Sequence, residues 1–194
     1  ISDEMKQAIL SYTSLKTLEL AHNKLTEFDI SIPSLEVLNL IQNRLTVMPI
    51  LSENLQKASF DFNVIKVLDK SSPVIKNLSL SLNYIDKVDE SLKLDKVESL
   101  DCSMNRISIL DKFSTMFPVV KTVNLAYNMI KDFPHPLSES IIELDLTGNE
   151  IETFTEEIRH LTNLQMLDIS HNNLTEIPEL PKSLKKIYAN NNKI

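Results

Sequence analysis

The side chains best suited to chemistry are few and scattered along this chain of 194 residues. There is one cysteine, Cys102, and the four histidines stand at His22, His135, His160 and His171. A metal site needs several donors, and one thiol with dispersed imidazoles does not supply them. No serine, histidine and acid grouping can be assembled from the spacing. We therefore predict no catalytic residue and no metal ligand.

The glycine content excludes a further set of reactive loops. The only glycine is Gly148. Phosphate-binding loops, dinucleotide-binding turns and nucleophile elbows each need two or more glycines at set spacing. We therefore expect no bound cofactor, and we predict that this chain is not an enzyme.

Charge and cysteine content bear on the partner and the compartment. The formal net charge is −7, whereas nucleic-acid binding needs a basic face, so a protein partner with a basic patch is favoured over nucleic acid. One cysteine cannot form an internal disulfide, which favours a cytoplasmic over an extracellular location. No apolar run approaches the ~20 residues that span a bilayer, so no membrane insertion is expected. Nothing indicates the oligomeric state.

One eleven-residue segment recurs along the chain and must position these side chains. Its form is L-x-x-L-x-L-x-x-N-x-L, as in LKTLELAHNKL at 15–25. Successive copies are 20 to 23 residues apart, a period typical of repeat architectures. The asparagine at the ninth place occurs in nine copies, at Asn23, Asn43, Asn63, Asn83, Asn105, Asn128, Asn149, Asn172 and Asn192.

The pattern predicts a stack of short strands. The alternating L-x-L indicates a strand with one buried face, and stacked copies form a parallel sheet. The first, fourth, sixth and eleventh places then fill the interior, and the asparagine amide can satisfy backbone groups of the turn. A second apolar column is expected five positions after each asparagine, at Phe28, Met48, Leu68, Val88, Leu110, Phe133, Phe154 and Ile177.

Residues 15–194 resemble the leucine-rich-repeat family. The resemblance implies an α/β solenoid with a curved, parallel β-sheet on its concave face and extended, 3-10 or short helical convex segments. The longer units, at 113–120 and 153–164, have room for a helical turn. Residues 174–187 are similar to short repeats of bacterial effector proteins and 151–164 to longer intracellular repeats, so no subfamily is assigned.

The organisation that we expect is a flank followed by nine repeats. Residues 1–14 carry a weak helical stripe and form either a cap or the end of a preceding repeat. Residues 15–194 form the repeats, of which the last is incomplete. Because a terminal repeat normally needs a polar cap, the stop at Ile194 indicates a fragment of a longer protein.

The repeat also gives the reactive side chains ordinary roles. Cys102 occupies the sixth place, which holds leucine in other copies, so we predict a small buried hydrophobe and not a reactive thiol. His22 and His171 share the eighth place but are too many repeats apart to share a ligand. We expect the histidines to be exposed turn residues.

Acidic side chains form the first candidate binding feature. The third, fifth and seventh places should face the concave side, and there the C-terminal half carries Asp101, Glu143, Asp145 and Asp168. Asp145 and Asp168 should lie on neighbouring strands, where like charges repel. Retaining them favours a basic partner. The alternative is an ordinary solvated face of an acidic protein.

Apolar side chains at the eighth place form the second candidate feature. They follow one another in repeats three to six as Phe62, Leu82, Met104 and Tyr127. If exposed, they make an apolar strip beside the concave face, which is typical of an interaction site. The alternative is that they pack beneath the neighbouring turns.

The resemblance implies a protein-interaction scaffold whose concave face binds a partner. Two alternatives stay open. One is a regulatory region of a larger signalling enzyme, such as a phosphatase, kinase, GTPase or cyclase. The other is an extracellular receptor or adhesion domain, which glycans at Asn77 or Asn173 would support, although we interpret both acceptor patterns as incidental.

Overall fold

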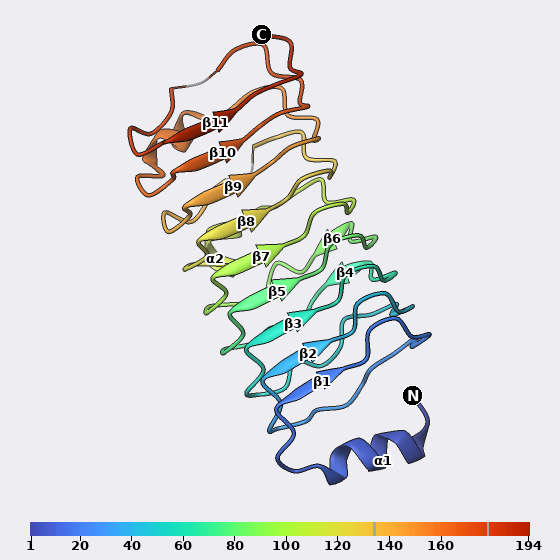
Figure 1. The fold of residues 1–194 in the computed structure, drawn as a ribbon. Helices are drawn as coiled ribbons and strands as arrows, with labels where there is room; N and C mark the ends of the chain where they lie inside the picture. The colour runs from blue at the N-terminus through green and yellow to red at the C-terminus, as the bar shows by residue number, and fades with distance from the viewer. Residues whose placement is uncertain (134, 178) are drawn as a thin grey trace.

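The repeats fold into a solenoid in which each repeat contributes one strand to a single parallel sheet (Figure 1). The computed structural model describes residues 1–133, 135–177 and 179–194. Within these ranges the sheet has nine strands in the order β1-β2-β3-β5-β7-β8-β9-β10-β11. They are β1 Thr17–Glu19, β2 Val37–Asn39, β3 Lys57–Ser59, β5 Asn77–Ser79, β7 Ser99–Asp101, β8 Thr122–Asn124, β9 Glu143–Asp145, β10 Met166–Asp168 and β11 Lys186–Tyr188.

Equivalent places of the repeat stand side by side in the sheet. Each strand covers the third to fifth places, and the register pairs like with like, for example Leu18 with Leu38 and Leu167 with Ile187. Any residue type that recurs at one place therefore forms a column along the solenoid. The predicted leucine-rich-repeat solenoid is confirmed.

The interior is filled by the apolar places of the repeat. Leu38, Leu40 and Leu45, at the fourth, sixth and eleventh places of repeat two, are each at most 2% exposed. In repeat one Leu18 is only partly buried, and Ile187 in the last strand is 38% exposed. These end strands have only one neighbouring strand to cover them.

The second apolar column is buried as predicted over most of its length. Phe28, Met48, Leu68, Leu110 and Phe133 are buried. Val88 and Phe154 are half-buried against the same core. The prediction is wrong for Ile177, which is 47% exposed because, among the described residues, its return segment has a neighbouring return segment on only one side.

The return segments on the other side of the solenoid follow the length of each unit. The longer units contain the helical turns that their length predicts, α2 at Phe113–Met116 and the 3-10 helix η1 at Glu156–His160. The 20-residue units are extended there. A small second parallel sheet pairs β4 Val67–Leu68, in a 20-residue unit, with β6 Lys87–Val88, in the 22-residue unit that follows.

The first residues form helix α1, Asp3–Ser11, beyond β1 at the N-terminal end of the sheet (Figure 1). The side chain of Ser2 accepts the Met5 N–H and caps the helix. Of the predicted apolar stripe only Ile9 is buried. Across the described residues, no helix has both the length and the apolar character that crossing a membrane would take.

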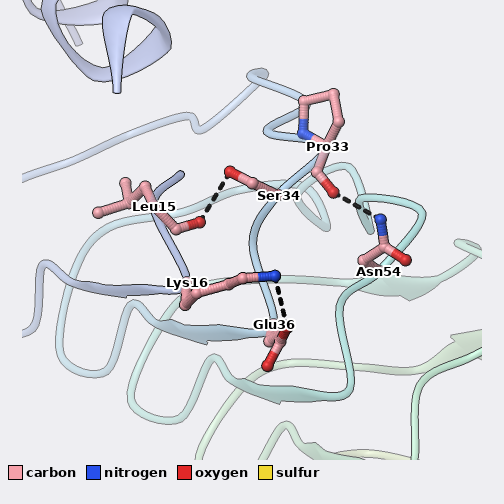
Figure 2. Close-up of polar contacts among 6 residues, drawn as sticks. All are labelled: Leu15, Lys16, Pro33, Ser34, Glu36 and Asn54. Atoms are coloured by element: carbon pink, nitrogen blue, oxygen red, sulfur yellow. Dashed lines mark hydrogen bonds and ion pairs between the residues drawn. The ribbon is translucent and has the colours of Figure 1, made fainter. Parts of the chain in front are cut away.

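Polar contacts link neighbouring repeats where the chain enters each strand (Figure 2). The Ser34 hydroxyl donates to the Leu15 carbonyl at 2.8 Å, and Lys16 Nζ lies 2.7 Å from Glu36 Oε1. The serine contact recurs in later repeats, from Ser140 to Val120 and from Ser183 to Leu164. These bonds fix the register from which the exposed columns are built.

Candidate functional site

The asparagine at the ninth place binds each turn to the repeat before it. Asn105 Oδ1 accepts the Ile85 N–H at 2.9 Å, and its Nδ2 donates to the carbonyls of Leu80, Cys102 and Ser103 at 2.9 to 3.1 Å. Equivalent inter-repeat bonds recur at every asparagine from the second to the ninth. The predicted role of this side chain is confirmed.

The residue before each asparagine has left-handed backbone. In this region a side chain with a Cβ costs ~1–2 kcal/mol; glycine adopts it readily, and asparagine, aspartate and histidine are enriched there among the other residue types. The turn requires this conformation whatever the residue type, because the following asparagine must point inward. The nine residues have φ between 53° and 68° and are His22, Gln42, Phe62, Leu82, Met104, Tyr127, Gly148, His171 and Asn191.

Four of these strained positions carry exposed or half-exposed apolar side chains. Phe62 is 53% exposed, Met104 45% and Tyr127 51%, while Leu82 is half-buried. The expectation that they pack beneath the neighbouring turns is therefore wrong for the first three. The four residues stand in consecutive repeats and form a column beside the sheet face, which we call the apolar ridge.

The ridge ends at Tyr127 because of the single glycine. Tyr127 lies against Gly148 in the next repeat, where an added Cβ would stand 2.6 Å from Tyr127 Cδ1. Gly148 therefore both relieves the left-handed backbone and leaves room for the tyrosine ring. The glycine count drew attention to this residue, but its contact with Tyr127 could not be predicted.

A second set of exposed side chains stands at the tenth place, two positions after each ridge residue. Tyr84 is 42% exposed and Met129 46%, and the Arg106 guanidinium lies 4.6 Å from the Tyr84 ring centroid. We call Tyr84, Arg106 and Met129 the outer row. A hollow of about 350 Å³ there includes Val64 in its lining. Sequence reasoning missed the outer row because the tenth place carries no single recurring residue type.

Three of the four predicted acidic residues have a structural role. Asp101, Asp145 and Asp168 each accept, through Oδ1, the backbone N–H of the residue two positions later at 2.9 Å. Asp145 and Asp168 are register partners on adjacent strands, as predicted. Glu143 is exposed on the same strand as Asp145. Glu143, Asp145 and Asp168 are therefore acidic neighbours on β9 and β10, whereas Asn124 on β8 separates Asp101 from Asp145.

Asp61 adds a carboxylate next to the ridge that sequence reasoning did not single out. Its Oδ1 accepts the Ser79 hydroxyl at 2.6 Å and the Ser81 N–H at 2.9 Å. Burial raises the pKa of Asp61 above the ordinary carboxyl value; these hydrogen bonds oppose that shift, and the charge of Asp101 adds to it. Because Asp61 directly precedes Phe62, an acidic group borders the first ridge residue.

The reactive side chains lie apart from this surface. Cys102 is 1% exposed, and burial raises the pKa of its thiol, so the predicted buried hydrophobe is confirmed. On the return side, His135 Nδ1 lies 2.6 Å from Glu157 Oε2. His135 and His160 line one cavity of about 410 Å³, a pairing that the sequence did not indicate. Among the described residues no cluster of three or more His, Cys, Asp or Glu could hold a metal ion.

Comparison with known proteins agrees with this architecture. A family profile described as leucine rich repeat matches residues 118–174. The human leucine-rich repeats and immunoglobulin-like domains protein 3 is 36% identical over 107 residues, which is 50% of this chain and 9% of that protein. The MAP kinase phosphatase with leucine-rich repeats protein 1 of Dictyostelium discoideum is 34% identical over 88 residues, 44% of this chain and 11% of that protein. The chain thus spans about a tenth of the length of these two relatives.

Solved structures are similar over nearly the whole chain. YopM of Yersinia enterocolitica has a TM-score of 0.82 and 27% identity, covering 94% of this chain and 39% of that one. The LRIM1/APL1C complex has a TM-score of 0.59 and 27% identity, covering 90% of this chain and 37% of that one. The TLR13–ssRNA13 complex has a TM-score of 0.73 and 24% identity, covering 89% of this chain and 28% of that one. Fold, repeat and profile define a parallel β-solenoid of stacked short repeats. This chain is a leucine-rich-repeat protein.

Proposed function

We propose that this chain is a protein-interaction module that binds its partner along the apolar ridge and the adjoining acidic sheet face. Leucine-rich-repeat folds generally serve as protein–protein interaction modules. Of the similar structures, the LRIM1/APL1C complex is by its name an assembly of two proteins. The coarse function follows from the family, whereas the surface is our assignment from the geometry.

The exposed apolar side chains on strained backbone carry this proposal. A turn that needs left-handed backbone is most stable with glycine or asparagine. An apolar side chain that stays exposed after folding contributes little hydrophobic free energy to the fold. Phe62, Met104 and Tyr127 thus stand where neither backbone conformation nor folding favours them. Burial of their side chains against a partner gives a reason for these residue types.

The acidic face supports a partner with basic groups beside its apolar contact. Asp101 and Asp145 use one carboxylate oxygen for a backbone N–H, and the charge of each carboxylate remains on the sheet face. Substitution by asparagine keeps an acceptor oxygen and removes the charge. Asp145→Asn therefore tests recognition of the charge alone, whereas Asp145→Lys would also remove the acceptor oxygen.

The test is a comparison of partners captured by matched variants. Affinity capture from a lysate of the source organism, with quantitative mass spectrometry, would compare the wild type with Met104→Asn and His22→Asn. Both substitutions place asparagine at the eighth place, but only the first alters the ridge. We expect at least one protein to fall about tenfold with Met104→Asn and to be unchanged with His22→Asn. Equal capture by all three chains would contradict the proposed surface.

A second candidate is a regulatory region whose ridge contacts another domain of the same protein. It is favoured by the similarity to the Dictyostelium phosphatase with leucine-rich repeats, of which this chain matches 11%. The same surface would then act within one polypeptide. A single-stranded RNA partner, which the TLR13–ssRNA13 complex contains, fits less well with a net charge of −7.

A further inference from the structure

We infer that the partner element on the apolar ridge is an amphipathic α-helix that lies along the solenoid axis. This inference rests on the proposed function, because it presumes that the ridge binds a protein. It adds the secondary structure of the bound segment and the spacing of its contact residues.

The spacing of the ridge residues carries the inference. Strands of a sheet are about 4.8 Å apart, so four ridge residues in consecutive repeats stand near 0, ~4.8, ~9.6 and ~14.4 Å along the axis. A helix rises 1.5 Å per residue, so its positions i, i+3, i+7 and i+10 stand near 0, ~4.5, ~10.5 and ~15 Å. Each contact residue of the helix falls within about 1 Å of one ridge residue.

An extended partner does not match this spacing. Residues on one face of a strand are about 6.7 Å apart, so the second lies about 2 Å from the nearest ridge residue and only the first and third, near 0 and ~13.4 Å, meet ridge positions. A polyproline helix repeats every ~9.3 Å and meets only every second ridge residue. The register that places Phe62, Leu82, Met104 and Tyr127 at regular intervals therefore selects helical periodicity.

The charges on the two sides of the ridge define the flanks of the helix. On the sheet side Asp61 directly precedes Phe62, and the Asp101 carboxylate accepts the N–H of Ser103, the residue before Met104. In the outer row Arg106 lies against Tyr84. A bound helix is thus expected to carry Lys or Arg on the flank toward the sheet and Asp or Glu on the other. Such a helix has an apolar stripe between flanks of opposite charge.

Two display libraries of matched diversity test this inference. One carries a helix-favouring 14-residue scaffold with apolar residues randomised at i, i+3, i+7 and i+10. The other carries an extended scaffold of the same length with the same residues at i, i+2, i+4 and i+6. Both are selected against the wild-type chain. Retained clones are then screened on Met104→Asn and on His22→Asn, to separate binders that depend on the ridge from those that do not.

We expect clones that lose binding on Met104→Asn and keep it on His22→Asn to be at least tenfold more frequent in the helical library. Such clones at equal or higher frequency in the extended library would overturn the helical inference and leave the ridge as a binding surface. If neither library yields ridge-dependent clones, both the inference and the proposed surface fail.

Discussion

At the residue scale, each turn depends on the asparagine at its ninth place. Removing the side chain of Asn105 leaves one N–H and up to three carbonyls without their partner, and each lost bond of this kind costs ~1–3 kcal/mol. We expect Asn105→Ala to lower the free energy of unfolding by about 3 kcal/mol in urea denaturation. Asn23→Ala is the control. Asn23 is exposed in the first repeat and bonds only to Leu20 and Ala21, so its loss should cost below about 1 kcal/mol. Equal losses would show that the inter-repeat bonds do not stabilise the stack.

A second prediction at this scale concerns how the carboxyl group of Asp61 makes the folding stability depend on pH. Because burial raises the folded-state pKa of Asp61, its contribution is most favourable at low pH and is lost as the pH rises through that pKa. Asp61→Asn keeps an oxygen for Ser79 and Ser81 and removes the charge. From about pH 3.5 to about pH 7 the variant should gain stability relative to the wild type, measured by thermal unfolding across that range.

Asp89 is the control of opposite sign. Hydrogen bonds from Ser91 lower the pKa of Asp89, so its contribution is present above the ordinary carboxyl pKa and is lost on acidification. Asp89→Asn should therefore lose stability relative to the wild type over the same rise in pH. If both variants follow the same trend, the assignment of the pKa direction at Asp61 is wrong.

At the residue scale, the roles that could be predicted from the sequence are those that follow from side-chain chemistry. An asparagine that recurs among leucines must satisfy buried backbone, and a cysteine at a leucine place must be buried, so both roles were predictable. The left-handed backbone at Phe62 or Met104 was not, because these residue types do not favour it. Of the nine turn residues, only His22, Gly148, His171 and Asn191 are of types enriched in that conformation.

At the element scale, the contact between the turns that carry Tyr127 and Gly148 determines where the ridge ends. Gly148→Ala would add strain at φ 68° and place a Cβ against the tyrosine ring, so we expect a loss of about 1–2 kcal/mol in the free energy of unfolding. A double-mutant cycle with Tyr127→Ala separates the two effects. The cost of Gly148→Ala should fall when the ring is absent. An identical cost in both backgrounds would mean that the contact contributes nothing.

Return segments show how far element prediction can go. The 23-residue units were predicted to have room for a helical turn, and α2 and η1 form there because a longer segment must span the same gap. The β4–β6 pair could not be predicted, because two-residue strands leave no periodic pattern. The exposed Ile177 also escaped prediction, since burial depends on a neighbouring repeat as well as on residue type.

At the scale of the whole molecule, parallel register converts a one-dimensional repeat into columns. The sheet face, its acidic pair Asp145 and Asp168, and the eighth-place column were therefore accessible from the sequence. Whether that column is exposed or covered depends on the backbone of the turn, which the sequence left open. The left-handed turn directs Phe62, Met104 and Tyr127 outward, and this is what makes the ridge a candidate surface.

The central claim is that the ridge residues are retained for binding at the expense of stability. The most direct measurement determines both quantities on the same variants: unfolding free energy in urea, and retained capture of the ridge-dependent partner. Met104→Asn should be more stable than the wild type by about 1 kcal/mol, because asparagine tolerates left-handed backbone better than methionine does. His22→Asn should raise the stability by less, because histidine is itself enriched in that conformation. Only Met104→Asn should lose the partner, by about tenfold or ~1.4 kcal/mol. A Met104→Asn chain that is less stable and still binds would contradict the claim, because the side chain would then serve the fold alone.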